Sequence, residues 1–345
     1  MHSENTSSRT VLVTGGSGFI GSNFIHYWLQ KYPNDKIVNL DSLTYAGNNQ
    51  NHLQIQDNPN YSFVKGSICD QKLVDSLTQD VELIVHFAAE SHVDRSILQP
   101  ALFLETNILG TQVLLDAAVR NKVSHFHHIS TDEVFGSLKL GSDQQFSETT
   151  PYDPRSPYSA SKAGSDHLVR AYGETFGLSY TITNCSNNYG QYQFPEKLIP
   201  LAITNILEGK KVPIYGEGQQ VRDWLYVYDH CVAIDLVISQ RKQGETYVVG
   251  GLSQDIPNKS VVIQILELMH APSDQIEHVQ DRAGHDERYS VNWSKIKSEL
   301  SWMPTVTFTE GLEKTIEWYV ANEVWWKPLK LANQDFYNKN YKQLA

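Results

Sequence analysis

Residues 10–21 read TVLVTGGSGFIG, and this stretch decides the fold. Residues 10–14 are apolar or β-branched, glycines follow at Gly15, Gly18 and Gly21, and an amphipathic stretch continues to about residue 30. This order predicts a strand, a tight turn and a helix. Glycine permits such a turn and lets backbone amides approach a pyrophosphate at the helix N-terminus, where the helix dipole favours negative charge. The spacing alone is also compatible with a purely structural corner.

The next strand-like segment gives the glycine turn its context. Residues 36–40 are mostly apolar and are followed by Asp41, twenty residues after Gly21. A carboxylate at this place accepts hydrogen bonds from a ribose 2′-hydroxyl and repels a 2′-phosphate. We therefore expect a dinucleotide site that prefers NAD to NADP.

Strands and helices alternate through the first half of the chain. Further apolar strands are predicted at residues 83–87, 125–130 and 180–184, with helices around residues 106–120 and 159–176. Such alternation implies right-handed βαβ units. The fold class is therefore α/β, a Rossmann-type doubly wound parallel sheet.

The composition and the length of the predicted elements change after about residue 187. Prolines and glycines separate shorter elements, which predicts a smaller C-terminal substrate-binding lobe. We place the NAD-binding domain at residues 1–186 and the sugar-nucleotide lobe at residues 187–345. The boundary is soft, because the strand-like segments 212–215 and 246–249 fit either part.

Composition excludes several classes of protein. The hydrophobic share is 40%, the charged share 19% and the formal net charge −11, which describes a globular protein rather than a nucleic-acid or anionic-membrane binder. The three cysteines are far apart and show no metal-binding spacing. Residues 1–9 are polar, and no run approaches about 18 apolar residues. We expect a cytoplasmic protein without a metal.

Tyr158 and Lys162 are four residues apart on one face of a predicted helix. An ammonium lowers the pKa of a nearby phenol, so the pair can provide a base for a sugar hydroxyl. Other pairs share this spacing but lack the surrounding SPYSASKA sequence (residues 156–163), and we interpret them as surface coincidences: Tyr27 with Lys31, Tyr32 with Lys36, and Tyr61 with Lys65. With the upstream nucleotide fold, the sequence around Tyr158 resembles the extended short-chain dehydrogenase/reductase family.

Thr131, Asp132 and Glu133 follow the predicted strand at residues 125–130. Ligands bind at the carboxyl ends of strands in doubly wound sheets. Two adjacent carboxylates are costly to bury as anions, so one should stay protonated. An elimination needs such a pair, because one group protonates the leaving hydroxyl while the other removes a carbon-bound proton. A solvated loop or a helix cap is the alternative interpretation for Asp132 and Glu133.

From about residue 11 to residue 319 the chain resembles the dTDP-glucose 4,6-dehydratase family. The matching runs, in chain order, are LTYAGN (43–48), HFAAESHVDRSI (86–97), HISTDEV (128–134), NCSNNYG (184–190), FPEKLIP (194–200), RDWLY (222–226) and GHD (284–286). The resemblance implies an NAD-dependent hydro-lyase and a homodimer.

The resemblance also implies a role for each catalytic residue. Tyr158, supported by Lys162 and Thr131, deprotonates the C4 hydroxyl as hydride passes to NAD. The new ketone acidifies the C5 proton, which Glu133 removes while Asp132 protonates the departing C6 hydroxyl. The hydride then returns to C6.

The remaining site residues follow from the same matches. The implied cofactor-binding residues are Gly15, Gly18, Phe19, Ile20, Gly21, Asp41, Ser42, Leu43, Thr44, Ser67, Ile68, Phe87, Ala88, Ala89, Ser91, Thr106, Tyr158, Lys162 and Asn188. The implied substrate-binding residues are Ser91, Thr131, Asn187, Lys197, Leu198, Pro213, Tyr215, Arg222, Asn258, Arg282 and His285. The two arginines suit a diphosphate, which a guanidinium pairs bidentately.

Some positions depart from the family pattern. Ser67 replaces an aspartate that meets the adenine amine, so either one hydrogen bond is weaker or Asp70 compensates. Phe135 replaces a tyrosine, Gln191 and Ala283 replace prolines, and a residue is inserted before Asn258 in a region that approaches the nucleotide. A UDP-sugar, either UDP-glucose or UDP-GlcNAc, therefore remains an alternative substrate. A 4-epimerase of the same fold is a weaker alternative because it has no use for Asp132 and Glu133, and a non-catalytic nucleotide sensor is weaker still.

Overall fold

The computed structural model describes residues 8–252, 255–281 and 285–340, with side chains described as far as residue 333. Its centre is a seven-stranded parallel sheet in the order β11-β6-β5-β4-β1-β2-β3. The strands are β1 (Thr10–Thr14), β2 (Lys36–Asp41), β3 (Tyr61–Lys65), β4 (Leu83–His86), β5 (His125–Thr131), β6 (Tyr180–Cys185) and β11 (Thr246–Val249).

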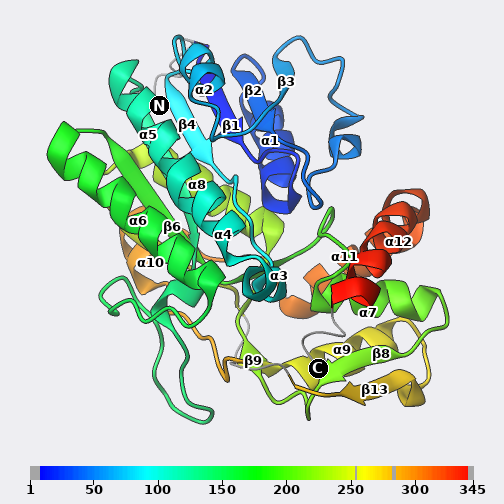
Figure 1. Cartoon of the computed structure of the whole chain (residues 1–345). Coiled ribbons are helices and arrows are strands. Elements are labelled where there is room, and N and C mark those ends of the chain that lie inside the picture. Colours follow the sequence, from blue (N-terminus) through cyan, green and yellow to red (C-terminus); the bar gives the residue numbers. More distant parts are fainter. Residues whose placement is uncertain (1–7, 253–254, 282–284, 341–345) are drawn as a thin grey trace.

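Helices cover both faces of this sheet (Figure 1). On β1, Val11 and Val13 pack against α1 and α8, whereas Leu12 belongs to the core on the opposite face. This alternation follows from the two-residue period of a strand. The helices are α1 (Phe19–Lys31) and α8 (Val227–Gln240) on one side, and α2 (Gln71–Leu77), α5 (Thr111–Arg120) and α6 (Pro157–Phe176) on the other. The predicted Rossmann-type sheet is confirmed.

The connection from β4 to α5 is helical but irregular. It contains α3 (Val93–Leu98), α4 (Pro100–Phe103) and a π-helical segment, η2 (Leu104–Gly110). Together residues 100–120 are long and apolar enough, at a mean hydropathy of 1.2, to cross a membrane by length and composition alone, although polar residues interrupt the stretch and leave no run of about 18 apolar residues. Within the molecule 44% of the apolar stretch is buried, and the core helix of a globular protein has the same length and composition.

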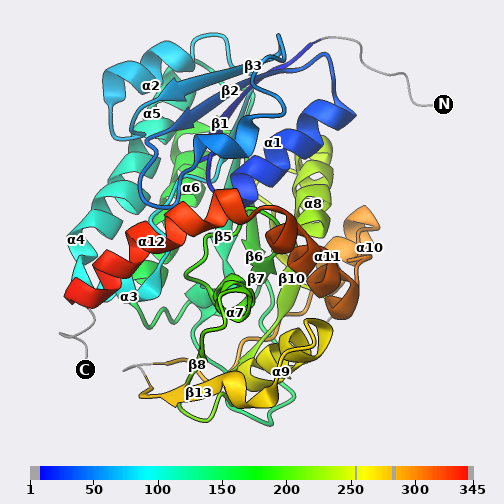
Figure 2. The same cartoon turned by 90° about the vertical axis from the view of Figure 1, so that its right-hand side faces the viewer.

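The second part of the structure lies below the carboxyl ends of the central strands (Figure 2). Its three small sheets pair β7 (Asn187–Tyr189) with β10 (Trp224–Tyr226), β9 (Val221–Arg222) with β12 (Ile256–Pro257), and β8 (Val212–Tyr215) with β13 (Ile276–Val279). A separate apolar core is built around Tyr189, Trp224 and Trp326. Its helices are α7 (Leu198–Leu207), α9 (Asn258–Leu268), α11 (Phe308–Ala321) and α12 (Glu323–Asn340), while α10 (Ser294–Leu300) packs near β11.

β11 belongs to the central sheet although it follows the second lobe in the sequence. The α12 helix in turn reaches back, because the indole of Trp325 donates to the side-chain oxygen of Asn51 at 2.8 Å. Asn51 lies in the short helix η1 (Asn49–His52), next to the glycine turn. We propose a division of the chain near residue 187, with residues 246–249 returning to the first domain.

Candidate active site

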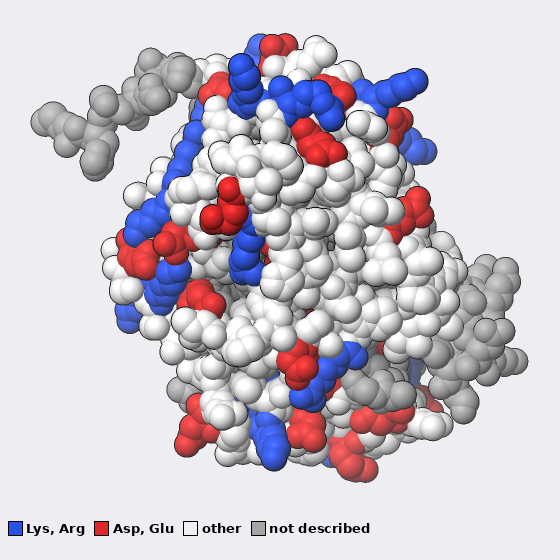
Figure 3. Space-filling model, turned by 60° about the vertical axis from the view of Figure 1, so that its left-hand side comes forward, with Lys and Arg blue, Asp and Glu red and all other residues white. Residues whose placement is uncertain are grey.

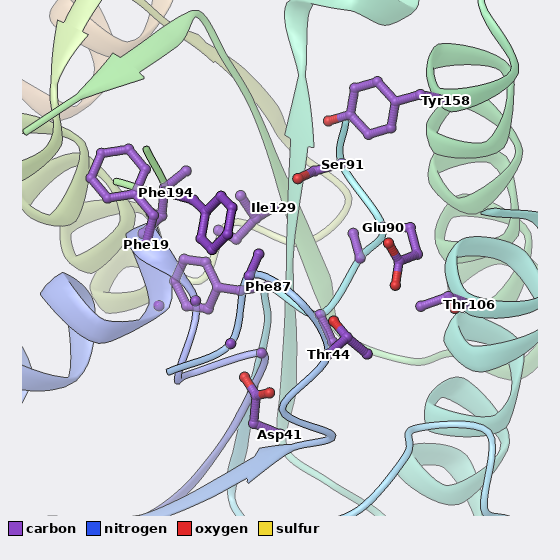
Figure 4. A pocket seen from close by; sticks show the side chains of 18 of the residues that line it. Phe19, Asp41, Thr44, Phe87, Glu90, Ser91, Thr106, Ile129, Tyr158 and Phe194 are labelled. Carbon is purple, nitrogen blue, oxygen red and sulfur yellow. The ribbon is translucent and has the colours of Figure 1, made fainter. Parts of the chain in front are cut away.

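A cavity of about 470 Å³ opens at the carboxyl ends of β1, β2, β4, β5 and β6. Figure 4 shows Asp41 and Tyr158 at opposite ends of it, with Phe19, Phe87 and Phe194 between them on one side. The cavity is therefore elongated, with the glycine turn near Asp41 and the predicted catalytic residues near Tyr158.

The glycine turn forms a cradle that side chains would fill. Gly15 has a φ of +69°, and a Cβ placed on it would lie 2.5 Å from the backbone nitrogen of Ala88. A Cβ on Gly21 would lie 2.4 Å from the carbonyl oxygen of Gly15. α1 begins directly after Gly18, with no side-chain cap and no acidic residue in its first turn. Its first backbone N–H groups are thus available to an anionic group, as a pyrophosphate requires.

Asp41 is the last residue of β2 and is 8% exposed. One carboxylate oxygen accepts a hydrogen bond from the Ser17 backbone N–H at 2.9 Å, and the other accepts one from Leu43 at 2.8 Å. Burial raises the pKa of Asp41 although these bonds lower it. Both oxygens keep acceptor capacity, so the carboxylate fits an adenosine ribose.

Of the residues predicted to bind the cofactor, the structure places all but Leu43 in the wall of this cavity. Leu43 instead turns the chain, with a φ of +51° and its N–H donated to Asp41. The donors and the cradle fit a dinucleotide. Asp70, the alternative partner for the adenine amine, is the N-cap of α2, accepts from the N–H groups of Lys72 and Leu73, and is not among the cavity-lining residues described.

Tyr158 lies in the first turn of α6. Ser156 and Ser159 form a capping box and Pro157 occupies the first helical turn, which fixes where the helix begins. Burial raises the pKa of Tyr158 well above its usual value, Glu133 adds to the rise, and a hydrogen bond with Thr131 opposes it. The predicted lowering by Lys162 is therefore wrong for the chain by itself, because desolvation of the phenolate outweighs it.

Lys162 is buried one turn after Tyr158. Its Nζ donates to the Ile129 carbonyl at 2.7 Å and lies 3.3 Å from His128 Nε2. Burial lowers the pKa of Lys162 to about 8, although Asp166 raises it. The ammonium is thus held in place by the backbone of β5 and stays charged at neutral pH.

A buried network behind Lys162 escaped sequence analysis. Asp166 accepts hydrogen bonds from Ser130 at 2.8 Å and Tyr152 at 2.8 Å, and it lies 3.1 Å from His128 Nε2. Burial alone would raise its pKa, but hydrogen bonds from His128 and Ser130 and the charge of Lys162 lower it to about 2. Asp166 is one helical turn beyond Lys162, a spacing that could have signalled it.

Thr131 ends β5 and caps the short helix η3 (Asp132–Phe135). Its hydroxyl accepts a hydrogen bond from the Glu133 backbone N–H at 3.3 Å and lies 3.4 Å from an oxygen of Asp132. The two carboxyl groups are not equivalent, because Glu133 lines the cavity whereas Asp132 is 1% exposed.

Asp132 is surrounded by other acids. Burial raises its pKa well above the usual value, Glu133 and Asp223 add to the rise, and Arg222 lowers it. One of its oxygens is buried and has no hydrogen-bond partner among the described groups. A protonated Asp132 beside a more accessible Glu133 is the asymmetry that acid–base elimination requires.

The residues predicted to bind substrate divide into two groups. Ser91, Thr131, Asn187 and Lys197 line the cavity. The other predicted residues that the structure describes do not line it: Leu198, Pro213, Tyr215, Arg222, Asn258 and His285. Arg282 lies outside the described residues.

Arg222 is 6% exposed and stacks on Tyr289, with its guanidinium carbon 4.3 Å from the ring centroid. It donates to the carbonyl oxygens of Val221 at 2.8 Å and Asp286 at 3.1 Å. In this position it acts electrostatically on Asp132. Its contact with a diphosphate stays a prediction.

Several lining residues were not singled out from the sequence. They are Leu40, Tyr45, Ala46, Gly47, Gly66, Cys69, Glu90, Leu102, Glu105, Ile129, Ser130, Cys185, Ser186, Gln193, Phe194 and Glu196. Glu90 and Glu196 belong to matching runs quoted above, so proximity to those runs was the available signal. No group of three or more His, Cys, Asp or Glu side chains suited to a metal ion occurs among the described residues.

Comparison with known proteins agrees with this geometry. Residues 12–315 match the family described as GDP-mannose 4,6 dehydratase. A dTDP-glucose 4,6-dehydratase of Escherichia coli is 49% identical over 96% of this chain and 99% of its own length. The crystal structure of DesIV, a dTDP-glucose 4,6-dehydratase of Streptomyces venezuelae with NAD and TYD bound, is 48% identical with a TM-score of 0.90, covering 93% of this chain and 99% of that one. A UDP-glucose 4-epimerase of Thermotoga maritima with UDP-glucose shares the fold at a TM-score of 0.83 but is 27% identical, covering 91% and 99%.

Proposed function

The chain belongs to the GDP-mannose 4,6-dehydratase family, and we propose its function on that basis. It is an NAD-dependent hydro-lyase that converts dTDP-glucose to dTDP-4-keto-6-deoxyglucose. Support for the nucleotide comes from relatives 49% and 50% identical that are named for dTDP-glucose. The reaction itself is supported by the asymmetric acid pair at the mouth of β5, which a 4-epimerase does not need.

We propose that one end of the cavity binds the adenosine and pyrophosphate of the cofactor and the other end binds its nicotinamide. The glycine cradle and the start of α1 hold the pyrophosphate, and Asp41 holds the adenosine ribose. Tyr158 and Lys162 then meet the nicotinamide end. When bound, a dinucleotide would supply the hydride acceptor for the sugar's oxidation and the hydride donor for the later reduction.

Tyr158 removes the proton of the C4 hydroxyl. The cost of forming a buried phenolate is offset by the ammonium of Lys162, which lies on the same face of α6 as Tyr158. The Ile129 carbonyl accepts a hydrogen bond from this ammonium and holds it in place. The hydroxyl of Thr131 lowers the pKa of the Tyr158 phenol and so stabilises its anion. The resulting C4 carbonyl acidifies the proton at C5.

Glu133 removes the C5 proton, and Asp132 protonates the departing C6 hydroxyl. The assignment rests on environment: Glu133 lines the cavity, whereas burial keeps Asp132 protonated and able to donate. Glu133 then returns its proton to C5 as C6 is reduced.

The test is mass spectrometry of the products formed from dTDP-glucose, UDP-glucose and UDP-GlcNAc side by side. We expect loss of one water and the highest rate with dTDP-glucose. With a deuterium label at C4, the label should appear at C6. A product of unchanged mass would indicate an epimerase, and a faster reaction with a UDP-sugar would reassign the nucleotide.

We also propose that the enzyme is a cytoplasmic homodimer joined through the helices at residues 100–120 and 157–176. Figure 3 shows the side of the molecule towards α6, where the middle of the face carries few charges. Exposed apolar side chains on these helices include Leu102, Leu104, Leu109 and Phe176. All three cysteines are free, which suits a reducing compartment. A monomer mass by light scattering at micromolar concentration would refute the dimer.

A further inference from the structure

The C-terminal helix α12 follows the second lobe in the sequence but contacts the cofactor domain at two separate places. Figure 2 shows α12 crossing the molecule between the central sheet and α7. The indole of Trp325 donates to Asn51, which lies beside the glycine turn. About 12 Å further along the helix, Asn333 accepts from Arg95 in α3. Trp325, Asn333 and Asn51 are buried and Arg95 is half-buried, so water competes poorly for these hydrogen bonds.

The contact with Trp325 fixes the orientation of the Asn51 amide. An indole N–H can only donate, so the Asn51 atom that it meets at 2.8 Å is the oxygen. The amide nitrogen of Asn51 therefore faces the glycine turn, where it donates to the Ser17 carbonyl at 3.1 Å and to the Ser22 hydroxyl at 2.9 Å. Because Asn51 is 2% exposed, water cannot readily replace the indole as the donor to its oxygen.

Ser17 lies between the glycines of the turn, and its backbone is held on both sides. Its carbonyl accepts from Asn51, and its N–H donates to Asp41 at 2.9 Å. A peptide unit is planar, so fixing the carbonyl of Ser17 also directs the N–H of Gly18, which donates to the Gly15 carbonyl at 3.1 Å. The indole on α12 thus supports, through Asn51, the shape of the turn on which the pyrophosphate is proposed to bind.

The contact with Asn333 supports the loop that follows β2. Arg95 donates to the side-chain oxygen of Asn333 at 2.6 Å, and its guanidinium carbon lies 3.7 Å from the centroid of the Tyr45 ring. The same guanidinium lies 3.5 Å from a carboxylate oxygen of Glu196. Tyr45 and Glu196 line the cavity, and so does Thr44, which is one of the predicted cofactor-binding residues. Both contacts of α12 therefore lead to the walls of the cofactor site.

We propose that Trp325 and Asn333 are positioning residues that hold the cofactor site in its binding shape and so slow the release of NAD. Neither side chain needs to touch the cofactor, since each acts through a residue of the first domain, Asn51 or Arg95. The inference rests on the proposed function, because a hydride removed from C4 must be kept until it is returned to C6 of the same sugar. The second lobe then retains the cofactor as well as binding the sugar nucleotide.

The test is the exchange of bound, labelled NAD after dilution of the holoenzyme into excess unlabelled NAD, without substrate. Trp325→Phe keeps a ring against Trp318 and removes the donor to Asn51. Since leaving a buried acceptor unsatisfied costs enough for about a tenfold change in an equilibrium, we expect exchange to be faster on the order of tenfold. Trp326→Phe is the matched control, because that buried indole donates to the Tyr319 carbonyl at 2.9 Å within the second lobe. Its exchange rate should equal that of the wild type.

Two further variants separate this role from general stabilisation of the fold. In an Asn51→Ala background, Trp325→Phe should cause no further acceleration, since it acts through Asn51. Asn333→Leu should also accelerate exchange, and it tests the other contact if Trp325→Phe does not fold. A wild-type exchange rate in folded Trp325→Phe or in Asn333→Leu would overturn the proposal. Equal acceleration in Trp326→Phe, or additive effects of Asn51→Ala and Trp325→Phe, would overturn it too.

The proposed function can fail separately from this proposal. If the wild-type enzyme releases no water from dTDP-glucose, the assigned reaction is wrong. The exchange of NAD is measured without substrate, so its dependence on Trp325 and Asn333 is read independently of that result.

Discussion

The buried charge of Lys162 is needed for catalysis but should lower the free energy of unfolding. We therefore expect Lys162→Met to be more stable and less active than the wild type. The ammonium is fully buried, and burial lowers its pKa from 10.5 to about 8. That difference corresponds to about 3 kcal/mol against the charged form in the native state. Methionine has a similar length and no charge, so it avoids this cost.

The gain in stability from removing the buried charge is partly offset, because the groups that interact with Lys162 lose a partner. The Ile129 carbonyl loses the donor at 2.7 Å, which costs about 1–3 kcal/mol if it is not replaced. Asp166 loses a cation but keeps hydrogen bonds from Ser130, Tyr152 and Asn184. We expect Lys162→Met to increase the free energy of unfolding by about 1 kcal/mol at pH 7, while activity falls on the order of 10²-fold or more.

The pH dependence has a definite sign. Between pH 8 and 10.5 the unfolded wild type binds more protons at this lysine than the native state, so wild-type stability rises with pH in that window. The advantage of Lys162→Met should therefore be constant below about pH 8 and shrink as the pH rises to 10.5.

The assay is urea unfolding of both proteins freed of dinucleotide, because a bound ligand adds its own free energy. Lys31→Met is the matched control, since Lys31 pairs with the buried Asp235 and its pKa is raised rather than lowered. That variant should be less stable than the wild type. If Lys162→Met is also less stable, and the gap does not change with pH, the reasoning about buried charge at this position is wrong.

Three further substitutions test other parts of the site. Glu133→Gln should still oxidise C4 but slow water loss on the order of 10²-fold or more, so reduced cofactor accumulates in the absorbance spectrum; normal product at full rate would remove Glu133 from the role of base. Tyr158→Phe keeps the ring beside Phe103 but lacks the base, and we expect no reduced cofactor on addition of substrate, whereas an undiminished signal would contradict its role. Gly15→Ala should lower the melting temperature and the affinity for NAD, because a Cβ would meet Ala88 at 2.5 Å; Gly141→Ala, at φ +73° with nothing within 4 Å, is the control, and equal losses in both would mean that backbone strain alone is responsible.

Much of the central sheet could be predicted because its strands are buried on both faces. The segment 10–14 was predicted with the bounds observed for β1, and residues 246–249 with those of β11. The strand β3 was missed, since YSFVK lies at the sheet edge and has no fully buried residue. The pairing of β8 with β13 was also beyond reach, because these four-residue strands are more than sixty residues apart in sequence.

The site was predictable where a short motif carries the chemistry. Tyr158, Lys162 and the three residues after β5 were found in this way, and the structure gathers them around one cavity or directly behind it. The environment of each group was not predictable. Burial reverses the expected direction of the pKa of Tyr158, whereas hydrogen bonds from His128 and Ser130 and the charge of Lys162 keep the buried Asp166 an anion.

The different environments of Asp132 and Glu133 show why tertiary structure decides their roles. They are neighbours in sequence and have the same functional group, so local sequence gives no reason to assign acid or base to either. The turn η3 directs consecutive residues to different sides: Glu133 reaches the cavity, while Asp132 is enclosed near Asp223 and Arg222. Two equally solvated carboxylates would both ionise and neither could donate a proton at neutral pH. The buried position of Asp132 is therefore what turns an acidic dipeptide into an acid and a base.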